Sequence, residues 1–448
     1  MLSAFLSAFR TPDLRKKLLF TLFMIAIYRL GATMPSPGVS YGNVQKCLDA
    51  VNNSDQSGVF TLLNLFSGGA LLQLSVFALG IMPYITASII LQLLTVVIPR
   101  LEQLRKEGQS GQAKITQYTR YLTLGLAILQ ASAFVALARS GRLFNGACDQ
   151  TQYPIIPDVS AHGVPQWLTL SVLVITMTAG TGVIMWLGEL VTDRGVGNGM
   201  SVLIFTSIAA RLPQEGYQIW QKNKYTFAVV IGVGLLVIAF VVFLEQAQRR
   251  VPVQYAKRMI GRRMYGGTST YIPLKVNQAG VIPVIFASSL LYLPQLAISF
   301  AGQNSTNAVV LWINRHIVSQ SDWVHIVLYF MMIVFFTYFY VSITFSPEER
   351  AEDMKKYGGF IPGIRPGRPT AEYLSFVLNR ITFPGSLYLG IIAVLPNFFL
   401  GVTGSGNSAA NNFPFGGTAV LIMVGVGLDT VKQIESQLMQ RNYEGFLR

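Results

Sequence analysis

Residues Val76–Ile98 read VFALGIMPYITASIILQLLTVVI, and this run contains no Lys, Arg, Asp or Glu. A bilayer core about 30 Å thick is crossed by a helix of about 20 mainly apolar residues. The run is long enough for one such helix, and the absence of charge extends over the whole of residues 56–99. The stretch therefore predicts a membrane-spanning helix.

The composition of the whole chain points the same way. Of its 448 residues, 52% are hydrophobic and 12% are charged, and the mean hydropathy is +0.47. A soluble domain carries about 25% charged residues, so this chain has too few to cover a water-facing surface. Disordered chains, in contrast, are poor in apolar residues and rich in charge. Composition thus excludes an ordinary soluble enzyme and favours an all-α membrane protein that crosses the bilayer repeatedly.

Ten apolar runs bounded by charge or by Pro and Gly clusters are candidate spans. An even number leaves both ends of the chain on one side, and five spans per half would make the halves inverted in topology. No strong internal repeat is visible in the sequence. The runs are Leu18–Met34, Val76–Ile98, Tyr121–Ala138, Leu168–Leu187, Gly199–Leu212, Phe227–Leu244, Ala279–Ala297, His325–Phe345, Phe383–Leu400 and Phe415–Val431.

The basic residues are distributed unevenly between the connecting segments. Basic residues favour the cytoplasmic side of a membrane, so their distribution predicts that both termini are cytoplasmic. The first apolar run lacks a following A-x-A-type site, and we expect no cleavable signal peptide. Twenty-six of the 34 Lys and Arg lie in the alternate segments 1–17, 99–120, 188–199, 245–278, 346–382 and 431–448.

These spans divide the chain into five parts. The first is expected to be amphipathic, because Leu2, Phe5, Leu6 and Phe9 follow helical spacing, although a frayed terminus is the alternative. The parts are 1–17, a cytoplasmic amphipathic segment; 18–212, the first five-helix half; 213–226, an exoplasmic connection; 227–431, the second half; and 432–448, a cytoplasmic tail.

The segment Thr61–Gln73 fits neither a span nor an aqueous loop. It has no charge, but Asn64, Ser67, Gly68 and Gly69 interrupt it. A second complete span here would also reverse the orientation of the basic loop that follows. Irregular backbone at membrane depth is tolerated where protein surrounds it or where it lines a cavity. We expect a re-entrant half-helix, either a gating element or a packing element.

Residues for catalysis, metal binding or ion coupling are not apparent. The sequence has no HExxH, GxSxG or Walker-type motif, and its two cysteines and three histidines are scattered, which leaves at most one disulfide. Arg29 is the only charge near the middle of a proposed span, and a structural role for it is the favoured interpretation. We predict no catalytic, cofactor or metal site. A transporter of neutral solutes stays open, and an intramembrane protease is a weaker alternative.

Two of the connecting segments, 245–278 and 346–382, combine many basic residues with turn-forming residues. Gly363–Gly367 reads GIRPG and predicts a Pro/Gly turn that presents Arg365. Such positive surfaces could bind anionic lipid, RNA or an acidic protein. They could also be solvated loops that only set the topology.

Several short segments, taken in order, resemble the SecY/Sec61-alpha family, whose bacterial members are the central subunits of the protein-conducting channel. Each is weak alone, but their order and spacing cover nearly the whole chain. They are NLFSGGA at 64–70, GIMPYITAS at 80–88, KEG at 106–108, QYTRY at 117–121, RGVGNG at 194–199, YAKR at 255–258, PLKVN at 273–277, AGVIP at 279–283, PGIRPG at 362–367 and FGGT at 415–418.

The resemblance implies a channel for unfolded preproteins in the bacterial cell (inner) membrane, built from two five-helix halves around a pore that opens sideways between spans. Its expected partners are SecE, SecG, the SecA motor, a translating ribosome with its RNA, signal-bearing preproteins and anionic lipid. By position in the matching motifs, the implied site residues are a pore ring of Ile81, Ile85, Ile204, Ile285 and Ile422; a plug that includes Asn64, Leu65, Phe66, Ser67, Gly68 and Gly69; lateral-gate residues Thr86, Ser88 and Asn277; and partner-binding residues Arg262, Arg263 and Arg365.

A physical argument supports the pore assignment. The side chains of an unfolded cargo change from residue to residue, so a tailored polar site does not suit the constriction. Apolar side chains deform without specific hydrogen bonds, and a ring of them restricts ions by dewetting. Periodicity alone would make the five isoleucines ordinary core or lipid contacts, and the motif matches favour the ring.

Overall fold

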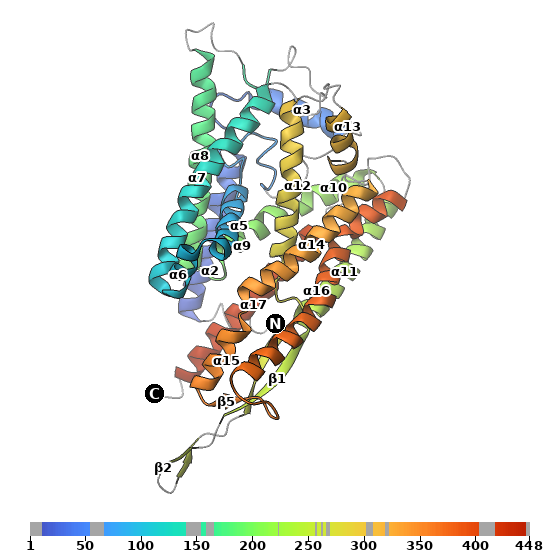
Figure 1. Ribbon diagram of the computed structural model, residues 1–448. Helices are drawn as coiled ribbons and strands as arrows, with labels where there is room; N and C mark the ends of the chain where they lie inside the picture. Colours follow the sequence, from blue (N-terminus) through green and yellow to red (C-terminus); the bar gives the residue numbers. More distant parts are fainter. Residues whose placement is uncertain are drawn as a thin grey trace.

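The computed structural model describes residues 11–53, 67–139, 154–157, 165–222, 224–255, 258–260, 263–265, 269–301, 308–318, 322–402 and 417–444. Helices dominate these residues, and the long ones run side by side between two ends of an elongated molecule (Figure 1). Connections and a small sheet occupy the lower end in that view. This arrangement agrees with the all-α membrane class that the sequence predicts.

Each of the ten predicted apolar runs overlaps a helix. In the first half these are α2 (Pro12–Thr33), α5 (Met82–Val97), α7 (Gln109–Arg139), α8 (Gln166–Arg194) and α9 (Gly199–Ala209). In the second half they are α11 (Lys224–Gln246), α12 (Ile282–Ala301), α14 (Trp323–Thr344), α16 (Arg368–Val402) and α17 (Gly417–Glu444). Shorter helices connect them: α3 (Tyr41–Asn53), α6 (Pro99–Lys106), α10 (Leu212–Lys222), α13 (Ala308–Ile313), the π-helical η3 (Asn314–Val318) and α15 (Pro347–Lys356).

Length and hydropathy alone qualify four helices of the described chain as membrane spans. They are Gln109–Arg139, Gln166–Arg194, the stretch Trp323–Lys356 that comprises α14 and α15, and Arg368–Leu395. A fifth candidate is the pair α5 and α6, which is bent by 101° at its junction. Pro99 at the start of α6 accounts for the break, because proline disfavours helical backbone at the residue before it.

Each half has its own apolar core. Residues of α2, α7, α8 and α9, such as Tyr28 and Leu203, form one buried cluster. Residues of α11, α12, α14, α16 and α17, such as Ile333 and Leu389, form another. Large apolar side chains on the outer faces, including Phe23 and Phe243, are exposed, as expected for helices surrounded by lipid. Two helix bundles, each with its own apolar core, fit the two-half architecture expected from the sequence.

The two basic loops differ from the expectation of turns alone, because they form a sheet. β1 (Gln248–Tyr255) pairs antiparallel with β4 (Ser269–Lys275) on one edge and with β5 (Gly359–Phe360) on the other. Two short strands, β2 (Arg258–Ile260) and β3 (Arg263–Tyr265), make a separate hairpin. Alternate residues of β1, Val251 and Val253, are buried in a third apolar cluster with residues of α14 to α16. Period-two burial is the pattern of a strand with one covered face.

Several predicted boundaries differ from the structure. α2 begins at Pro12, so part of the expected amphipathic segment belongs to the first spanning helix, while residues 1–10 lie outside the described chain. Likewise α16 begins in the predicted loop and α17 continues into the predicted tail. Charged residues end a hydropathy run but not a helix, because backbone hydrogen bonds continue wherever helix formers follow.

The largest difference concerns residues 67–81, which form successive turns and not the helix predicted from Val76 onward. Positive φ angles at Gly68, Gly69, Leu74 and Gly80 are incompatible with a continuous helix. Of the predicted half-helix Thr61–Gln73, residues 67–73 are therefore turns, and residues 61–66 lie outside the described chain.

Candidate functional site

The five isoleucines predicted for the pore ring come together. Ile81 caps the start of α5, Ile204 lies on α9, Ile285 on α12 and Ile422 on α17, and all four are buried in one apolar cluster. Ile85, on α5, is half-buried and packs against the same cluster. The cluster belongs mainly to the first half, but Ile285 and Ile422 enter it from the second. The isoleucines thus lie where the two halves meet.

The RGVGNG sequence positions Ile204. Gly197 has a φ of +88°, and a Cβ at Gly199 would lie 1.9 Å from the carbonyl oxygen of Gly188, so α8 and α9 meet through backbone atoms. Asn198 caps α9 by accepting a hydrogen bond of 3.1 Å from the Met200 backbone N–H. This tight turn directs the apolar face of α9, with Ile204, toward the other isoleucines.

Three helices hold the turn segment 67–81 beside the ring. On α2, Arg29 Nη1 donates a 2.8 Å hydrogen bond to the carbonyl oxygen of Gly68, which agrees with the structural role expected for this arginine. On α9, Ser207 lies close to Gly68: a Cβ added at Gly68 would be 3.3 Å from the Ser207 Cα. On α8, Gly180 leaves room for the Val76 carbonyl, which would be 2.0 Å from a Cβ at this position.

Of the predicted plug residues, Ser67, Gly68 and Gly69 are described. Ser67 is buried, and its Oγ accepts a 3.1 Å hydrogen bond from the Leu71 backbone N–H. Asn64, Leu65 and Phe66 lie outside the described residues. The end of the predicted plug is therefore seated against α2 and α9, next to the isoleucine cluster.

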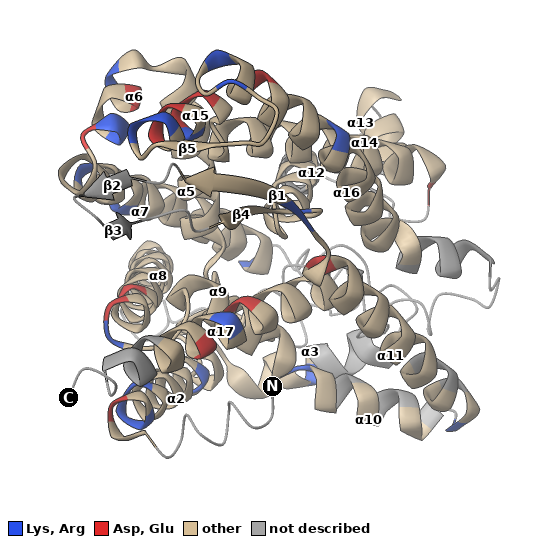
Figure 2. Ribbon diagram, turned by 90° about the horizontal axis from the view of Figure 1, so that it is seen from below, with Lys and Arg blue, Asp and Glu red and all other residues tan. Residues whose placement is uncertain are grey.

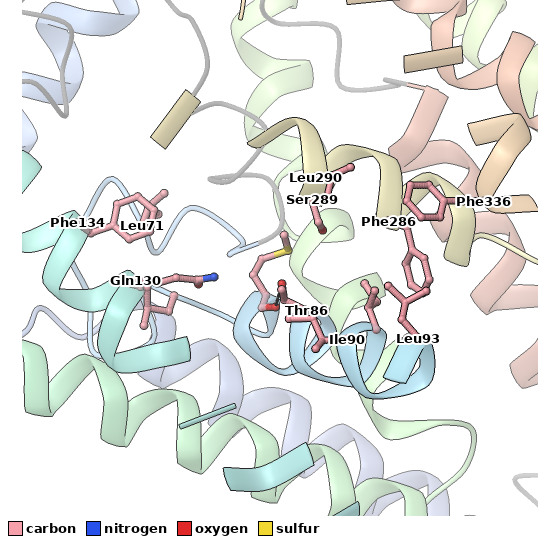
Figure 3. Close-up of a pocket in the computed structure, with 14 residues that line it drawn as sticks. Leu71, Thr86, Ile90, Leu93, Gln130, Phe134, Phe286, Ser289, Leu290 and Phe336 are labelled. Atoms are coloured by element: carbon pink, nitrogen blue, oxygen red, sulfur yellow. Dashed lines mark hydrogen bonds between the residues drawn. The ribbon is translucent and has the colours of Figure 1, made fainter. Parts of the chain in front are cut away.

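A cavity of about 150 Å³ lies beside the ring, between α5 and α7 of the first half and α12 and α14 of the second. Its lining is mostly apolar. Figure 3 shows Thr86 and Ile90 of α5 on one side and Phe286 and Ser289 of α12 on the other. Phe286 also packs edge-to-face on Phe336 of α14, with ring centroids 5.6 Å apart. The contact between the halves here therefore consists of apolar side chains with a few hydroxyl and amide groups.

The predicted lateral-gate residues are placed differently from one another. Thr86 lines the cavity, and its Oγ1 donates to the Met82 carbonyl oxygen at 2.9 Å. Ser88 is half-buried on α5 and is not among the lining residues. Asn277 is also absent from the lining and lies buried before the start of α12, where it contacts Glu245 of α11.

Sequence reasoning missed Gln130, Phe286, Ser289 and Phe336, which also line the cavity. Gln130 could have been noticed, because it is a polar residue inside the apolar run Tyr121–Ala138. The two phenylalanines carry no such signal, since aromatic residues are common on every face of a membrane helix. Only the packing of α12 against α5 and α14 selects them.

The connections predicted to be cytoplasmic share one end of the molecule. Arg105 of α6 donates a 3.0 Å hydrogen bond to the Ile343 carbonyl at the end of α14, and Lys275 of β4 pairs with Asp429 of α17 at 3.4 Å. Leu14, near the start of α2, packs with Ile434 of α17 at the same end. Figure 2 looks onto this end and shows charged residues on α6, α15 and α17 around the β1–β4 pair.

Arg365 is exposed at this end, in the turn between β5 and α16. Gly363 and Gly367 on either side have φ angles of +83° and +107°, and Thr370 Oγ1 donates to the Arg365 carbonyl at 2.8 Å. The predicted Pro/Gly turn is confirmed, and it fixes the backbone from which this guanidinium projects. Arg263 belongs to β3, whereas Arg262 lies outside the described residues.

The opposite end carries a covalent cross-link. Cys47, on α3 at the top of Figure 1, is buried and disulfide-bonded. The sequence contains one other cysteine, Cys148, which lies outside the described residues.

Two apolar helix bundles that meet at a buried isoleucine cluster, with a cavity between them, fit a helical membrane channel. Residues 75–431 match the sequence model of the SecY family. The protein translocase subunit SecY of Streptomyces coelicolor is 65% identical over 453 residues, which cover 100% of both chains. The chain belongs to the SecY family and is a channel subunit of a protein translocase.

Solved structures agree with the fold. A structure described as a protein-conducting channel superposes with a TM-score of 0.61 at 20% identity, covering 94% of this chain and 92% of that one. Sec61 in a canine ribosome–channel complex from the endoplasmic reticulum superposes with a TM-score of 0.58 at 19% identity, with the same coverage. The two matches show that this helical arrangement is retained at low sequence identity.

Proposed function

We propose that unfolded preproteins pass through the collar formed by Ile81, Ile85, Ile204, Ile285 and Ile422, and that apolar segments leave sideways between α5 and α12. The observation that carries this proposal is the convergence of isoleucines from both halves in one buried cluster next to the α5–α12 cavity. An apolar collar fits any passing side chain and restricts ions by dewetting. The cavity lining, apolar with a few hydroxyls, suits an emerging signal segment.

Within this proposal the segment that ends at Gly69 acts as the plug, and Thr86 and Ser88 on α5 with Asn277 before α12 act at the lateral gate. Its support is the seating of Gly68 against Arg29 and Ser207, beside the collar. A closed channel then has two obstructions in series, the collar and the plug. Displacement of the plug and separation of α5 from α12 would open different routes, one across the membrane and one into it.

We infer that the basic residues Arg262, Arg263 and Arg365 bind the partners that drive transport, namely the SecA motor or a translating ribosome and its RNA. Exposed arginine on a rigid turn suits phosphate and carboxylate groups, to which guanidinium donates two parallel hydrogen bonds. The canine Sec61 relative was solved in a ribosome–channel complex. SecE and SecG are the expected companion subunits, and anionic lipid the expected neighbour of the basic loops. We propose no catalytic role for the chain itself, so the energy for directional transport comes from these partners.

For the orientation we propose the bacterial cell membrane with both termini in the cytoplasm. Twenty-six of 34 Lys and Arg belong to the segments predicted to be cytoplasmic, and the described parts of α2, α6, β4 and α17 in these segments share one end of the molecule. The disulfide of Cys47 lies at the other end, and disulfides persist in oxidising, exoplasmic compartments. Single cysteines at Ser110 and Lys355 should therefore react with an impermeant maleimide only from the cytoplasmic side, and one at Tyr41 only from outside. The reverse labelling pattern would overturn this orientation.

Reconstitution tests the function as a whole. The chain, assembled with SecE and SecG in vesicles, is supplied with SecA, ATP and a signal-bearing preprotein, and protease-protected preprotein is measured. We expect protection that requires both ATP and the signal segment. An assembled complex that gives no protection above a signal-less control would contradict the proposal. Saturable uptake of a small solute would favour the transporter alternative.

A further inference from the structure

A buried carboxylate lies in the last turn of α11, outside the site described above. Glu245 is only 8% exposed. Burial removes the hydration of the charged form, and the C-terminal end of a helix already carries partial negative charge from its free carbonyl groups. Both effects are unfavourable for a carboxylate. A specific partner is needed to hold it there.

That partner is Asn277, which is only 4% exposed. Its Nδ2 donates to Glu245 Oε2 at 2.9 Å and to the carbonyl oxygen of Gly280 at 3.1 Å. A carboxylate and a carbonyl can only accept, so the amide must turn its NH₂ group toward both. One side chain thereby connects the end of α11 with Gly280, two residues before the start of α12.

The backbone just before Asn277 is fixed to its surroundings. The Val276 N–H donates to the Ala247 carbonyl at 3.0 Å and so extends the β1–β4 ladder to the end of α11. On α16, a Cβ at Gly385 would lie 2.3 Å from the Val276 carbonyl oxygen, so the two backbones are in contact. Val276 therefore belongs to the rigid framework of the second half.

The chain changes direction immediately afterwards. Gly280 has a φ of +62°, and α12 starts at Ile282. The Asn277 side chain bonds to Gly280 within this turn and to Glu245 on α11. Beyond the turn, α12 carries Ile285 into the collar and Ser289 into the cavity wall. The angle at which α12 leaves the turn sets its distance from α5.

We propose that Glu245 is a positioning residue for α12: acting through Asn277, it holds the start of this helix in the orientation that keeps α5 and α12 together. The inference rests on the proposed sideways release between these helices. Other charged groups face the same carboxylate, namely Lys275, Asp429 and Lys432. Lys275 is paired with Asp429, so it does not replace the bond from Asn277.

The test measures how apolar a signal must be to open the channel. Glu245→Leu removes the acceptor, and Asn277→Asp places a carboxylate against Glu245. Each variant is reconstituted with SecE and SecG and supplied with SecA, ATP and preproteins whose signals have graded hydrophobicity. In both variants we expect the ratio of weak-signal to strong-signal transport to rise about tenfold above that of wild type. A change of this size corresponds to losing one hydrogen bond to a charged group. Glu245→Gln keeps an acceptor for Asn277 and should behave as wild type.

Two further measurements separate the possible failures. Asp353→Asn is the matched control, since it removes an exposed carboxylate on α15 that contacts neither Glu245 nor Lys275, and its signal requirement should be unchanged. Cysteines at Thr86 and Ser289, in a background with Cys47 and Cys148 replaced by Ser, report the α5–α12 gap through the yield of a short bismaleimide cross-link. We expect this yield to fall in Glu245→Leu and in Asn277→Asp.

An assembled Glu245→Leu complex with wild-type signal selectivity and cross-linking would overturn the role of Glu245. If Glu245→Leu does not assemble, Asn277→Asp decides the matter by the same readouts. A Glu245→Gln variant as permissive as Glu245→Leu would also overturn it, because the hydrogen bond would then be irrelevant. If the wild-type cross-link yield does not respond to a strong signal, the proposed sideways opening itself fails.

Discussion

Gly80 and Gly280 occupy equivalent positions before α5 and α12, and their φ angles are nearly the same, +57° and +62°. Each is followed by a proline, Pro83 or Pro283, in the first turn of its helix, where a missing N–H is no loss. Ile85 and Ile285 follow at the same spacing and reach the same cluster. The two helices that border the cavity thus begin with the same local structure in opposite halves, as expected for an inverted repeat.

The isoleucine collar should control resting ion leak. Replacing Ile204 and Ile285 with Asn supplies hydrogen-bond partners to water in the constriction, so we expect resting single-channel conductance to rise severalfold while preprotein transport persists. The control pair is Ile175→Asn with Ile391→Asn, two exposed isoleucines on the outer faces of α8 and α16. Equal conductance in the two doubly substituted, fully assembled complexes would remove the collar assignment.

Gly180 should be intolerant of even one methyl group. Its Cβ would lie 2.0 Å from the backbone oxygen of Val76, which cannot move independently of the turn segment, so Gly180→Ala should cost about 1–3 kcal/mol. Gly182 lies on the same helix, and the nearest atom to its Cβ is Leu124 Cδ2 at 3.8 Å. Thermal unfolding in detergent should therefore show a lower Tm for Gly180→Ala and little change for Gly182→Ala. Similar Tm values for the two would mean that α8 and residues 67–81 are not in close contact.

The native cysteines should be unreactive until reduced. Cys47 is disulfide-bonded and Cys148 is the only other cysteine, so denatured, unreduced protein should incorporate no maleimide and reduced protein should incorporate two. Cys47→Ser should free one thiol without reductant. Mass spectrometry counts the adducts, and labelling of unreduced wild-type protein would show that the bond does not form in the membrane.

Arg365 should be needed for partner engagement and not for assembly. Arg365→Glu replaces attraction by repulsion toward an acidic site, and we expect SecA affinity and preprotein transport to fall by tenfold or more. Arg139→Glu is the matched control. Arg139 is also exposed, but it is the last residue of α7 and lies at the end of the molecule opposite to Arg365. Binding is measured by titrating SecA onto reconstituted vesicles. Loss of SecE association together with transport would assign Arg365 a structural role.

Sequence alone determined the features that depend on local composition. Membrane-spanning segments are recognisable because a bilayer requires a run of apolar residues, and the uneven distribution of Lys and Arg predicts their sidedness. The turn that presents Arg365 was predictable because its signal is also local: Pro restricts and Gly permits particular backbone angles within a few residues. The sheet of the basic loops was missed, although the alternation of Val251 and Val253 was available as a signal.

Tertiary structure decided what depends on contacts between distant segments. Whether Ile204 lines a collar or fills an ordinary core depends on where α9 lies relative to α12 and α17, and motif resemblance was the only guide to that from sequence. The turns at 67–81 replaced a predicted helix because α2, α8 and α9 hold the segment in conformations that its apolar composition does not reveal. The bond between Glu245 and Asn277 joins residues 32 positions apart. Hydropathy is a property of each residue, whereas a hydrogen bond of this kind exists only once the helices and strands have packed.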